Sequence, residues 1–162
     1  MAKRVFTQVH AVAGAIIEKD GKILLVKEVW ASPDQGKWNQ PAGWIDIGDN
    51  PLYSVVKEVK EETGYDFVPT GLLGIYSIVR KDLEKEIEAG FPHAVKLIFV
   101  GEISGAPQSG NDEIGEVRWF SPEEIEEMGT ALLRDMDIKN EVKDYFIKKP
   151  LPLETISHFV QN

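Results

Sequence analysis

The segment from Asn50 to Gly64 has the strongest local folding signals in this chain of 162 residues. Asn50 suits the N-cap of a helix, and Pro51 suits the first helical position, where its missing N–H costs no hydrogen bond. Gly64 suits the left-handed residue that follows the last turn. Between these caps, four apolar residues follow the i, i+3, i+4, i+7 spacing of one helix face: Leu52, Val55, Val56 and Val59. The sequence therefore predicts an amphipathic helix over residues 50–63.

Strand signals lie on both sides of this helix. Two apolar runs, Val9–Glu18 and Lys22–Val29, are separated by an Asp-Gly turn signal and predict a β-hairpin. Three further strands are expected at 72–79, 95–103 and 116–120, followed by a short helix at 122–128 and an amphipathic helix at 135–147. The latter has four apolar residues on one side, namely Ile138, Val142, Tyr145 and Phe146. Strands with interspersed helices indicate an α/β (α+β) sandwich.

Length and charge limit the class of protein. A chain of this length fits one domain by the usual size of roughly 100–200 residues, so we expect residues 1–162 to form a single unit that ends in a helix and tail at 135–162. The 27 acidic and 18 basic residues give a net charge of −9, which argues against binding a nucleic acid polymer. Such a charge still admits a small phosphorylated substrate if a metal cation offsets the repulsion.

Cysteine content and apolar runs bear on the compartment. The chain has no cysteine, which excludes a disulfide framework, a zinc-thiolate site and a thiol nucleophile and is compatible with a reducing cytoplasm. The apolar stretch from Val9 to Ile17 indicates a buried strand rather than a secretory signal, because a turn signal ends it. No apolar run approaches the 18 or so residues of a membrane span. We therefore expect a cytoplasmic protein without membrane contact.

Three glutamates, Glu58, Glu61 and Glu62, lie within roughly a 100° arc on the flank of the apolar stripe. One interpretation is a solvated acidic face that Lys57 and Lys60 moderate. The other is a site for a hard cation, because carboxylates on one face can share Mg²⁺ or Mn²⁺, which prefer oxygen ligands. The spacing of these residues alone does not separate the two.

The wider pattern resembles a known family motif. Gly43 is followed by five residues, then Asp49, then seven residues, then Lys-Glu-Val-Lys-Glu-Glu-Thr-Gly-Tyr over 57–65. This resembles the Nudix box, a long motif with fixed spacing, and the resemblance extends to an early strand at 22–27 and to a late strand and helix at 116–124. It covers roughly residues 8–147.

The resemblance implies a fold, a reaction and a role for each matched residue. The Nudix fold holds a loop–helix–loop box against a mixed β-sheet flanked by helices, and the family hydrolyses nucleoside diphosphates linked to another moiety. Matched metal ligands for Mg²⁺ or Mn²⁺ are Glu58, Glu61, Glu62 and the main-chain oxygen of Gly43. A further acid is expected from the loop before the late strand, where Glu113 is the candidate and Asp112 and Glu116 are alternatives. The general base stays open between Glu58, Glu62 and Glu113.

Three positions depart from the family pattern: Asp49 replaces Glu, Lys57 replaces Arg and Tyr65 replaces an aliphatic residue. The family's arginine usually braces the box carboxylates. A lysine cannot make the two-pronged contact of a guanidinium, and Asp is one methylene shorter than Glu. We therefore expect the brace of the box carboxylates to be looser here or water-mediated.

Residues outside the box select the substrate. The run Trp38–Gly43 resembles Nudix phosphatases that act on nucleoside di- and triphosphates and on thiamine-type pyrophosphates, and 133–138 is similar to a segment of relatives that act on oxidised nucleoside diphosphates. Trp44 and Trp30 are candidates for stacking on a base. Candidate phosphate contacts are Lys27, Arg80, Lys81, His93 and Lys96, each of which is otherwise an ordinary charged residue. The charged insertion over 80–93 is a candidate lid or binding loop.

The sequence thus predicts a metal-dependent hydrolase acting on a phosphoanhydride. The alternative is a non-catalytic Nudix domain that binds a nucleotide or a protein partner. The oligomeric state is left open, with a homodimer included.

Overall fold

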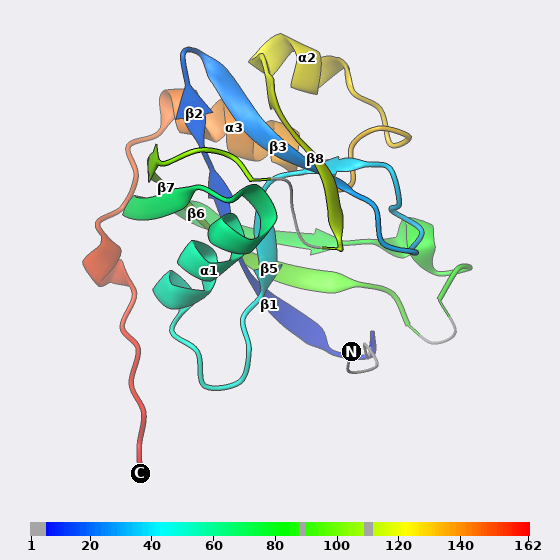
Figure 1. The fold of residues 1–162 in the computed structure, drawn as a ribbon. Coiled ribbons are helices and arrows are strands. Elements are labelled where there is room, and N and C mark those ends of the chain that lie inside the picture. The colour runs from blue at the N-terminus through cyan, green and yellow to red at the C-terminus, as the bar shows by residue number, and fades with distance from the viewer. Residues whose placement is uncertain (1–5, 88–89, 109–111) are drawn as a thin grey trace.

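The structure is a computed structural model that describes residues 6–87, 90–108 and 112–162 (Figure 1). Its strands are β1 (Val9–Ile16), β2 (Glu18–Lys19), β3 (Lys22–Glu28), β4 (Trp38–Asn39), β5 (Ala42–Trp44), β6 (Asp66–Val79), β7 (His93–Ser104) and β8 (Ile114–Phe120). Its helices are α1 (Pro51–Thr63), α2 (Pro122–Glu127) and α3 (Ile138–Ile147), with two 3₁₀ turns at Lys81–Leu83 and Leu153–Thr155. No helix in these ranges combines the length and apolarity needed to cross a membrane.

Four strands form a mixed sheet in the order β5-β1-β7-β6. Strand β1 pairs in parallel with β7 along its whole length, from Val9 opposite His93 to Ile16 opposite Val100, and β5 and β6 add antiparallel edges. Strand β6 begins at Asp66, earlier than the predicted Leu72, because irregularities near Pro69 and Gly74 interrupt the alternation that marks a strand in the sequence. The predicted mixed sheet flanked by helices is confirmed.

The predicted hairpin is only partly correct. Strands β2 and β3 do pair across Asp20 and Gly21, whose φ angles of 52° and 77° suit a tight two-residue turn. However, the hairpin contains only two residue pairs, and the run from Val9 does not continue it. Strand β1 instead joins the mixed sheet, while β3 pairs with β4 and β8 in a second sheet. An apolar run buried on both faces has no local signal that selects its partner.

Helix α1 has the predicted caps and buried face. The side chain of Asn50 accepts a hydrogen bond from the Leu52 N–H at 3.0 Å, and Gly64 closes the helix with a φ of 79°. Val55 and Val59 are fully buried against one face of the mixed sheet. Their neighbours in this core come from four strands and a connecting residue: Ala13, Ala15, Ile17, Leu24, Phe67, Leu72 and Phe99.

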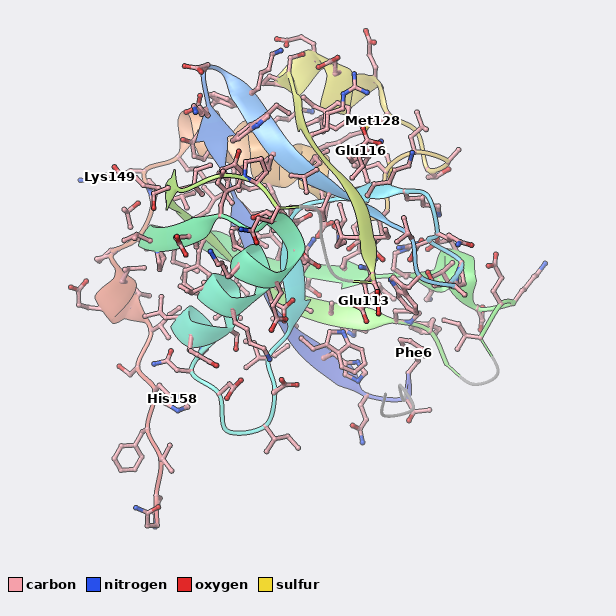
Figure 2. All side chains as sticks on the ribbon, viewed as in Figure 1. Phe6, Glu113, Glu116, Met128, Lys149 and His158 are labelled. Carbon is pink, nitrogen blue, oxygen red and sulfur yellow. The ribbon has the colours of Figure 1, made fainter. Side chains whose placement is uncertain are left out.

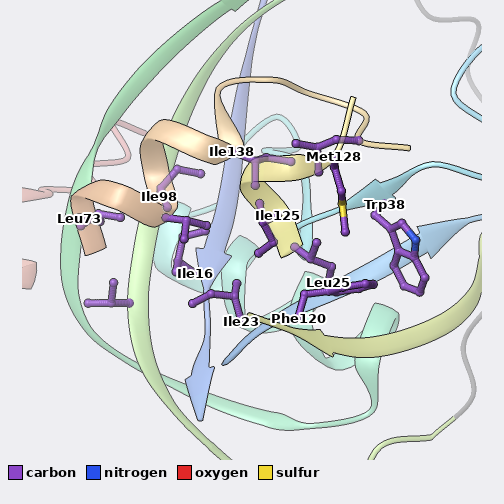
Figure 3. Close-up of a cluster of buried hydrophobic side chains, with 13 residues drawn as sticks. Ile16, Ile23, Leu25, Trp38, Leu73, Ile98, Phe120, Ile125, Met128 and Ile138 are labelled. Carbon is purple, nitrogen blue, oxygen red and sulfur yellow. The ribbon is translucent and has the colours of Figure 1, made fainter. Parts of the chain in front are cut away.

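A second core lies on the opposite face of β1, where Ile16 alternates with Ala13 and Ala15 (Figure 3). Strands β6 and β7, the second sheet, the helices α2 and α3 and the segment between these helices supply its other residues, including Ile98, Ile125 and Ile138. Phe146 was expected in this core, but half of its surface is exposed, because it lies at the margin of the α3 stripe. The mixed sheet is packed between the two cores, and this packing fixes the position of α1 relative to β1 and β5.

We expect two isoleucines, one buried beneath α1 and one exposed, to contribute very differently to the free energy of unfolding. Ile17→Ala should lower the free energy of unfolding by about 2–5 kcal/mol, because it opens a cavity in the core that α1 covers. Ile47 is fully exposed in the loop before α1, so Ile47→Ala should change it by less than about 0.5 kcal/mol. Denaturant unfolding of both variants checks this, and equal losses would contradict the assigned core.

Candidate active site

A cavity of about 710 Å³ opens on the mixed sheet, on the same face as the second core. Register places Trp44, Val12 and Lys96 in one row across β5, β1 and β7, and His10 beside Ala94 in the next row. These side chains form the floor of the cavity. The box helix and the loops around β3 and β8 supply the walls, with Gly43, Glu58, Glu62, Glu28, Asp34, Glu113 and Arg134 among the lining residues.

Gly43 and Glu58 lie in direct contact. A Cβ added to Gly43 would lie 2.2 Å from the carboxyl carbon of Glu58 and 2.4 Å from each of its carboxylate oxygens. The absence of a side chain at Gly43 therefore makes the space in which the carboxylate lies. Burial raises the pKa of Glu58 to about 7, and the negative charge of Glu61 contributes to the rise.

Glu62 is anchored to the strand that begins the box. Its Oε2 accepts a hydrogen bond from the Ala42 N–H at 3.0 Å. Burial raises the pKa of Glu62 well above its ordinary value, the charge of Glu58 adds to this rise, and the Ala42 N–H opposes it. A carboxylate in such surroundings is stabilised in its charged form by a cation.

The remaining predicted ligands differ in position. Glu113 immediately precedes β8, lines the cavity and contributes to the raised pKa of Glu58 (Figure 2). Glu116 lies further along β8, where it is exposed and faces Lys27 at 4.0 Å, and Asp112 is exposed. Glu61 is also exposed, and it is not among the residues that line the cavity. Of the three candidates from the β8 loop, the structure therefore brings Glu113 next to the box.

These residues fit a divalent cation, although their side chains are not gathered around one point. In the described ranges no group of three or more acidic or histidine side chains is close enough to hold a metal ion. Mutual repulsion of unneutralised carboxylates opposes such closure. The observation that supports the fit is the contact at Gly43, which places the carboxylate of Glu58 against the main chain of a matched ligand.

The net charge of the cavity lining also fits a divalent cation. Eight carboxylates and only three basic side chains, Arg80, Lys96 and Arg134, line the described part of it. Arg80 contacts Asp34, Asp82 and Asp135 at 2.8–3.0 Å. Lys96 contacts Asp137 at 2.9 Å and Glu141 at 2.7 Å. Because these basic side chains are already paired with carboxylates, an anionic substrate needs further positive charge to enter the cavity.

Arg80 and Lys96 therefore lie at the cavity, but in surroundings that the sequence did not reveal. Both are almost fully buried, and their partners come from distant parts of the chain. Their proposed contact with phosphate stays a prediction. In the structure they join the β3–β4 loop, the start of the charged insertion and the segment before α3 into one ionic network.

Sequence analysis missed Glu28, although it singled out Trp30 and the segments that contain the other two partners of this carboxylate. This buried carboxylate accepts hydrogen bonds from Trp30 Nε1 at 2.7 Å and from Asn39 Nδ2 at 3.2 Å, and it pairs with Arg134. Gln40 is also fully buried and donates to Glu141 at 2.5 Å. The only available signal was a glutamate at the end of an apolar strand, which does not by itself indicate a site.

Aromatic side chains surround one part of the cavity. Trp44 stacks on His10, with ring centroids 4.0 Å apart and planes 18° apart, and Phe6 meets His10 edge-on. Trp30 also lines the cavity. Trp44 therefore lines the cavity with His10 stacked on one face of its ring, and its stacking on a base stays a prediction.

Two other candidate phosphate contacts, Lys27 and His93, differ in whether they line the cavity. Lys27 faces Glu116 and lies over the Trp38 ring, and it is not among the residues that line the cavity. His93 does line the cavity, where its Nε2 lies 3.0 Å from the Ser77 hydroxyl. The position of Lys27 leaves its proposed phosphate contact without structural support.

Lys57, the residue expected to brace the box carboxylates loosely or through water, pairs directly with an acid that the family pattern does not mark. Lys57 Nζ lies 3.3 Å from Asp46 Oδ2, in the loop that leaves β5. Asp49 instead uses its main-chain N–H to close a turn with Asp46. The pairing differs because Asp46 lies at the start of this turn, a position that the box spacing does not mark.

Comparisons with known proteins agree with the fold. The family model described as the NUDIX domain matches residues 7–142. An ADP-ribose pyrophosphatase of Methanocaldococcus jannaschii is 28% identical over 142 residues, which cover 88% of this chain and 76% of that protein. The phosphatase NudJ of Escherichia coli K12 is 26% identical over 93% of this chain and 92% of its own length. A solved NUDIX hydrolase from Nitrosomonas europaea superposes with a TM-score of 0.81 at 28% identity, covering 94% of this chain and 98% of its own.

The fold is a mixed sheet on which the box helix packs beside an acidic cavity. The chain belongs to the Nudix family of hydrolases. The family members act on derivatives of nucleoside diphosphates, and the sequence-based assignment of family and fold is confirmed.

The contact at Gly43 generates a prediction that separates activity from stability. Gly43→Ala should push the Glu58 carboxylate aside, and a displacement of about 1 Å at a reacting group can cost about 10²-fold in rate. The flexible glutamate can move, so the melting temperature should change little. Gly129→Ala is the matched control, because no atom lies within 4 Å of its added Cβ. Steady-state kinetics and thermal melts of both variants check this, and full activity of Gly43→Ala would contradict it.

The buried pair of Glu141 and Lys96 predicts a pH-dependent stability. Burial raises the pKa of Glu141 to about 7, and Lys96 opposes this rise only partly because it also serves Asp137. The folded protein thus binds the Glu141 proton more tightly than the unfolded chain does. The free energy of unfolding must then fall as the pH rises from about 4.5 to 7.

Glu141→Gln removes the titrating group, so its melting temperature should fall less between pH 5 and pH 7 than that of the wild type. Glu84→Gln removes the same charge from an exposed position and should keep the wild-type slope. Thermal melts across this pH range measure the difference. Parallel curves for the wild type and Glu141→Gln would show that Glu141 titrates normally.

Proposed function

We propose that this protein is a Mg²⁺- or Mn²⁺-dependent hydrolase that cleaves a phosphoanhydride bond in a nucleoside di- or triphosphate or a related pyrophosphate, including thiamine-type pyrophosphates. The observation that carries the proposal is the placement of the Glu58 carboxylate against Gly43, at the wall of a cavity large enough for a nucleotide. The names of the relatives, an ADP-ribose pyrophosphatase and a phosphatase, support this substrate class.

The proposed ligands of the cation are Glu58, Glu61, Glu62, Glu113 and the main-chain oxygen of Gly43. A divalent cation there would neutralise phosphate charge, polarise a phosphoryl oxygen and favour ionisation of a bound water. The chain contributes the rigidity of the site. Glu62 is held by the Ala42 N–H, and α1 is held by its caps and its buried valines.

The cavity also provides candidate bases for the attacking water. Glu58, Glu62 and Glu113 all line it, so each is placed to accept a proton from a water molecule inside the cavity. Lys57 is not one of these candidate bases, but its positive charge lowers the pKa of Glu58. Its partner Asp46 lines the cavity, so the pair connects the outer face of α1 to the cavity wall.

Neutral replacements of the box acids test the proposal. Glu61→Gln and Glu62→Gln should each lower kcat/KM by about 10²-fold or more, since losing a general base alone typically costs 10²–10⁴-fold. Glu58→Gln should also lose activity, and Glu113→Gln should show an intermediate loss. Glu84→Gln is the control, because Glu84 is exposed and lies outside the cavity lining.

The assay is a panel of nucleotides, sugar nucleotides and thiamine pyrophosphate, with release of phosphate and pyrophosphate measured with and without Mg²⁺ or Mn²⁺. Millimolar metal should also raise the melting temperature of the wild type, and Glu61→Gln should weaken that rise. If both Glu61→Gln and Glu62→Gln hydrolyse the best substrate within threefold of the wild type, the box is not the catalytic site. The protein would then be a binding module.

A further inference from the structure

The outer edge of the mixed sheet, which β6 forms, is protected along only part of its length. Over residues 66–74 the strand contains two irregularities, one of them beside Pro69. Leu151 also covers this part of the edge, because it pairs with Leu72 through two main-chain hydrogen bonds of 2.8 and 2.9 Å. Bulges, prolines and covering segments are the usual features that prevent an edge strand from pairing with another chain.

The last part of β6, residues 75–79, lacks these features. In the part of the chain that the structure describes, β7 is the only strand that pairs with it. Its sequence, Ile-Tyr-Ser-Ile-Val, has no charge and no proline, and four of its residues are β-branched or aromatic types that favour strands. Ile75 is 66% exposed, Val79 is 42% exposed, and Ser77 between them is exposed as well. An exposed edge of this composition is suited to pairing with a further strand.

The exposed side chains of this segment continue an open apolar face of the mixed sheet. Ile75 lies opposite Leu97, which packs against the core beneath α1, so this is the face that α1 covers further along the strands. Beyond the helix the face is formed by Val9 and Ala11 on β1, Val95 and Leu97 on β7, and Ile75 and Val79 on β6. The solvent-facing side of a sheet is ordinarily polar, so an apolar one indicates an interface.

Charge and symmetry favour a second copy of this chain as the partner. Each chain has a net charge of −9, so two copies repel each other unless they meet over uncharged surfaces. Residues 67–79 contain no Asp, Glu, Lys, Arg or His. The same segment in a second copy offers the same strand-forming sequence and the same exposed apolar side chains. It is therefore complementary to itself when two copies are related by a two-fold axis.

We propose that two copies of this protein pair through residues 75–79 of β6, antiparallel and centred on Ser77, so that their two mixed sheets become one continuous sheet. In this register Ser77 faces its own counterpart, and Ile75 of each copy faces Val79 of the other. Apolar residues that lie directly opposite each other stabilise antiparallel strands. Ile78, on the other face of the same segment, lines the cavity, so the interface adjoins the candidate active site. The pairing does not depend on the proposed hydrolysis.

The first test is the mass of the protein in solution. Sedimentation equilibrium at about 100 µM chain, where a contact of micromolar affinity is saturated, should give twice the 18.2 kDa of one chain. Ser77→Lys should raise the dissociation constant at least tenfold, because it places two lysines directly opposite each other. Val68→Lys is the matched control, since Val68 is 62% exposed on the same strand but lies outside the pairing segment. A monomeric wild type, or a Ser77→Lys variant that dimerises as tightly as the wild type, would overturn the proposal.

A charge exchange tests the register. Ser77→Glu alone should also be monomeric, whereas an equimolar mixture of Ser77→Lys and Ser77→Glu should dimerise. A mixture that stays monomeric would show that Ser77 does not face its counterpart, and the proposed pairing would be wrong.

A crosslink gives a second measurement that stands even if the charged variants fail to fold. The chain has no cysteine, so the only disulfide that Ser77→Cys can form joins two chains. Residues directly opposite each other in antiparallel strands lie within the Cα separation of a disulfide, so mild oxidation should link most of this variant into a covalent dimer. Val68→Cys should stay largely unlinked under the same conditions. Equal crosslinking of the two variants would contradict pairing centred on Ser77.

Discussion

The burial of Val55 and Val59 under α1 is the interaction on which the site depends. These two side chains press α1 onto β1 through Ala13, Ala15 and Ile17, so the helix cannot rotate about its axis without exposing them. Glu58 and Glu62 are adjacent to this stripe and are thereby directed at Gly43 and Ala42 on β5. The small residues of β1 and β5 matter as much as the large ones, because they let the helix approach the sheet closely enough for a carboxylate to touch the main chain.

This arrangement concentrates negative charge that the fold does not neutralise. The basic side chains at the cavity are engaged by Asp34, Asp135, Asp137 and Glu28, so they do not offset Glu58 and Glu62. The raised pKa values of both glutamates express the free energy that burial and mutual repulsion cost. A bound cation would recover part of that free energy, so the repulsion between these carboxylates would also be the source of an affinity for a cation.

The parts of the structure that sequence could predict are those encoded by short-range signals. The caps of α1, its apolar stripe and the spacing from Gly43 to Glu62 lie within a single segment, so helix and box were readable residue by residue. The partner strand of β1 could not be predicted in this way. Its parallel pairing with β7 joins residues more than 80 positions apart in the sequence, and it leaves no local signal in the run that begins at Val9. For the same reason, the salt bridges of Arg80 with Asp34 and Asp135 could not be foreseen from a charged insertion.

The contacts that sequence missed are non-local, and they lie around the cavity outside the box segment. The box places acids on α1 in any chain that contains it, so it indicates the reaction and says little about the substrate's other end. The surroundings of Asn39 are built from Glu28 on β3, Trp30 in the following loop and Arg134 before α3. These three segments meet only when β3 has paired with β4 and the segment before α3 has come to lie beside β4. The polar surroundings of the cavity therefore depend on long-range strand pairing, whereas the acids of the box are presented by one helix and the strand beneath it.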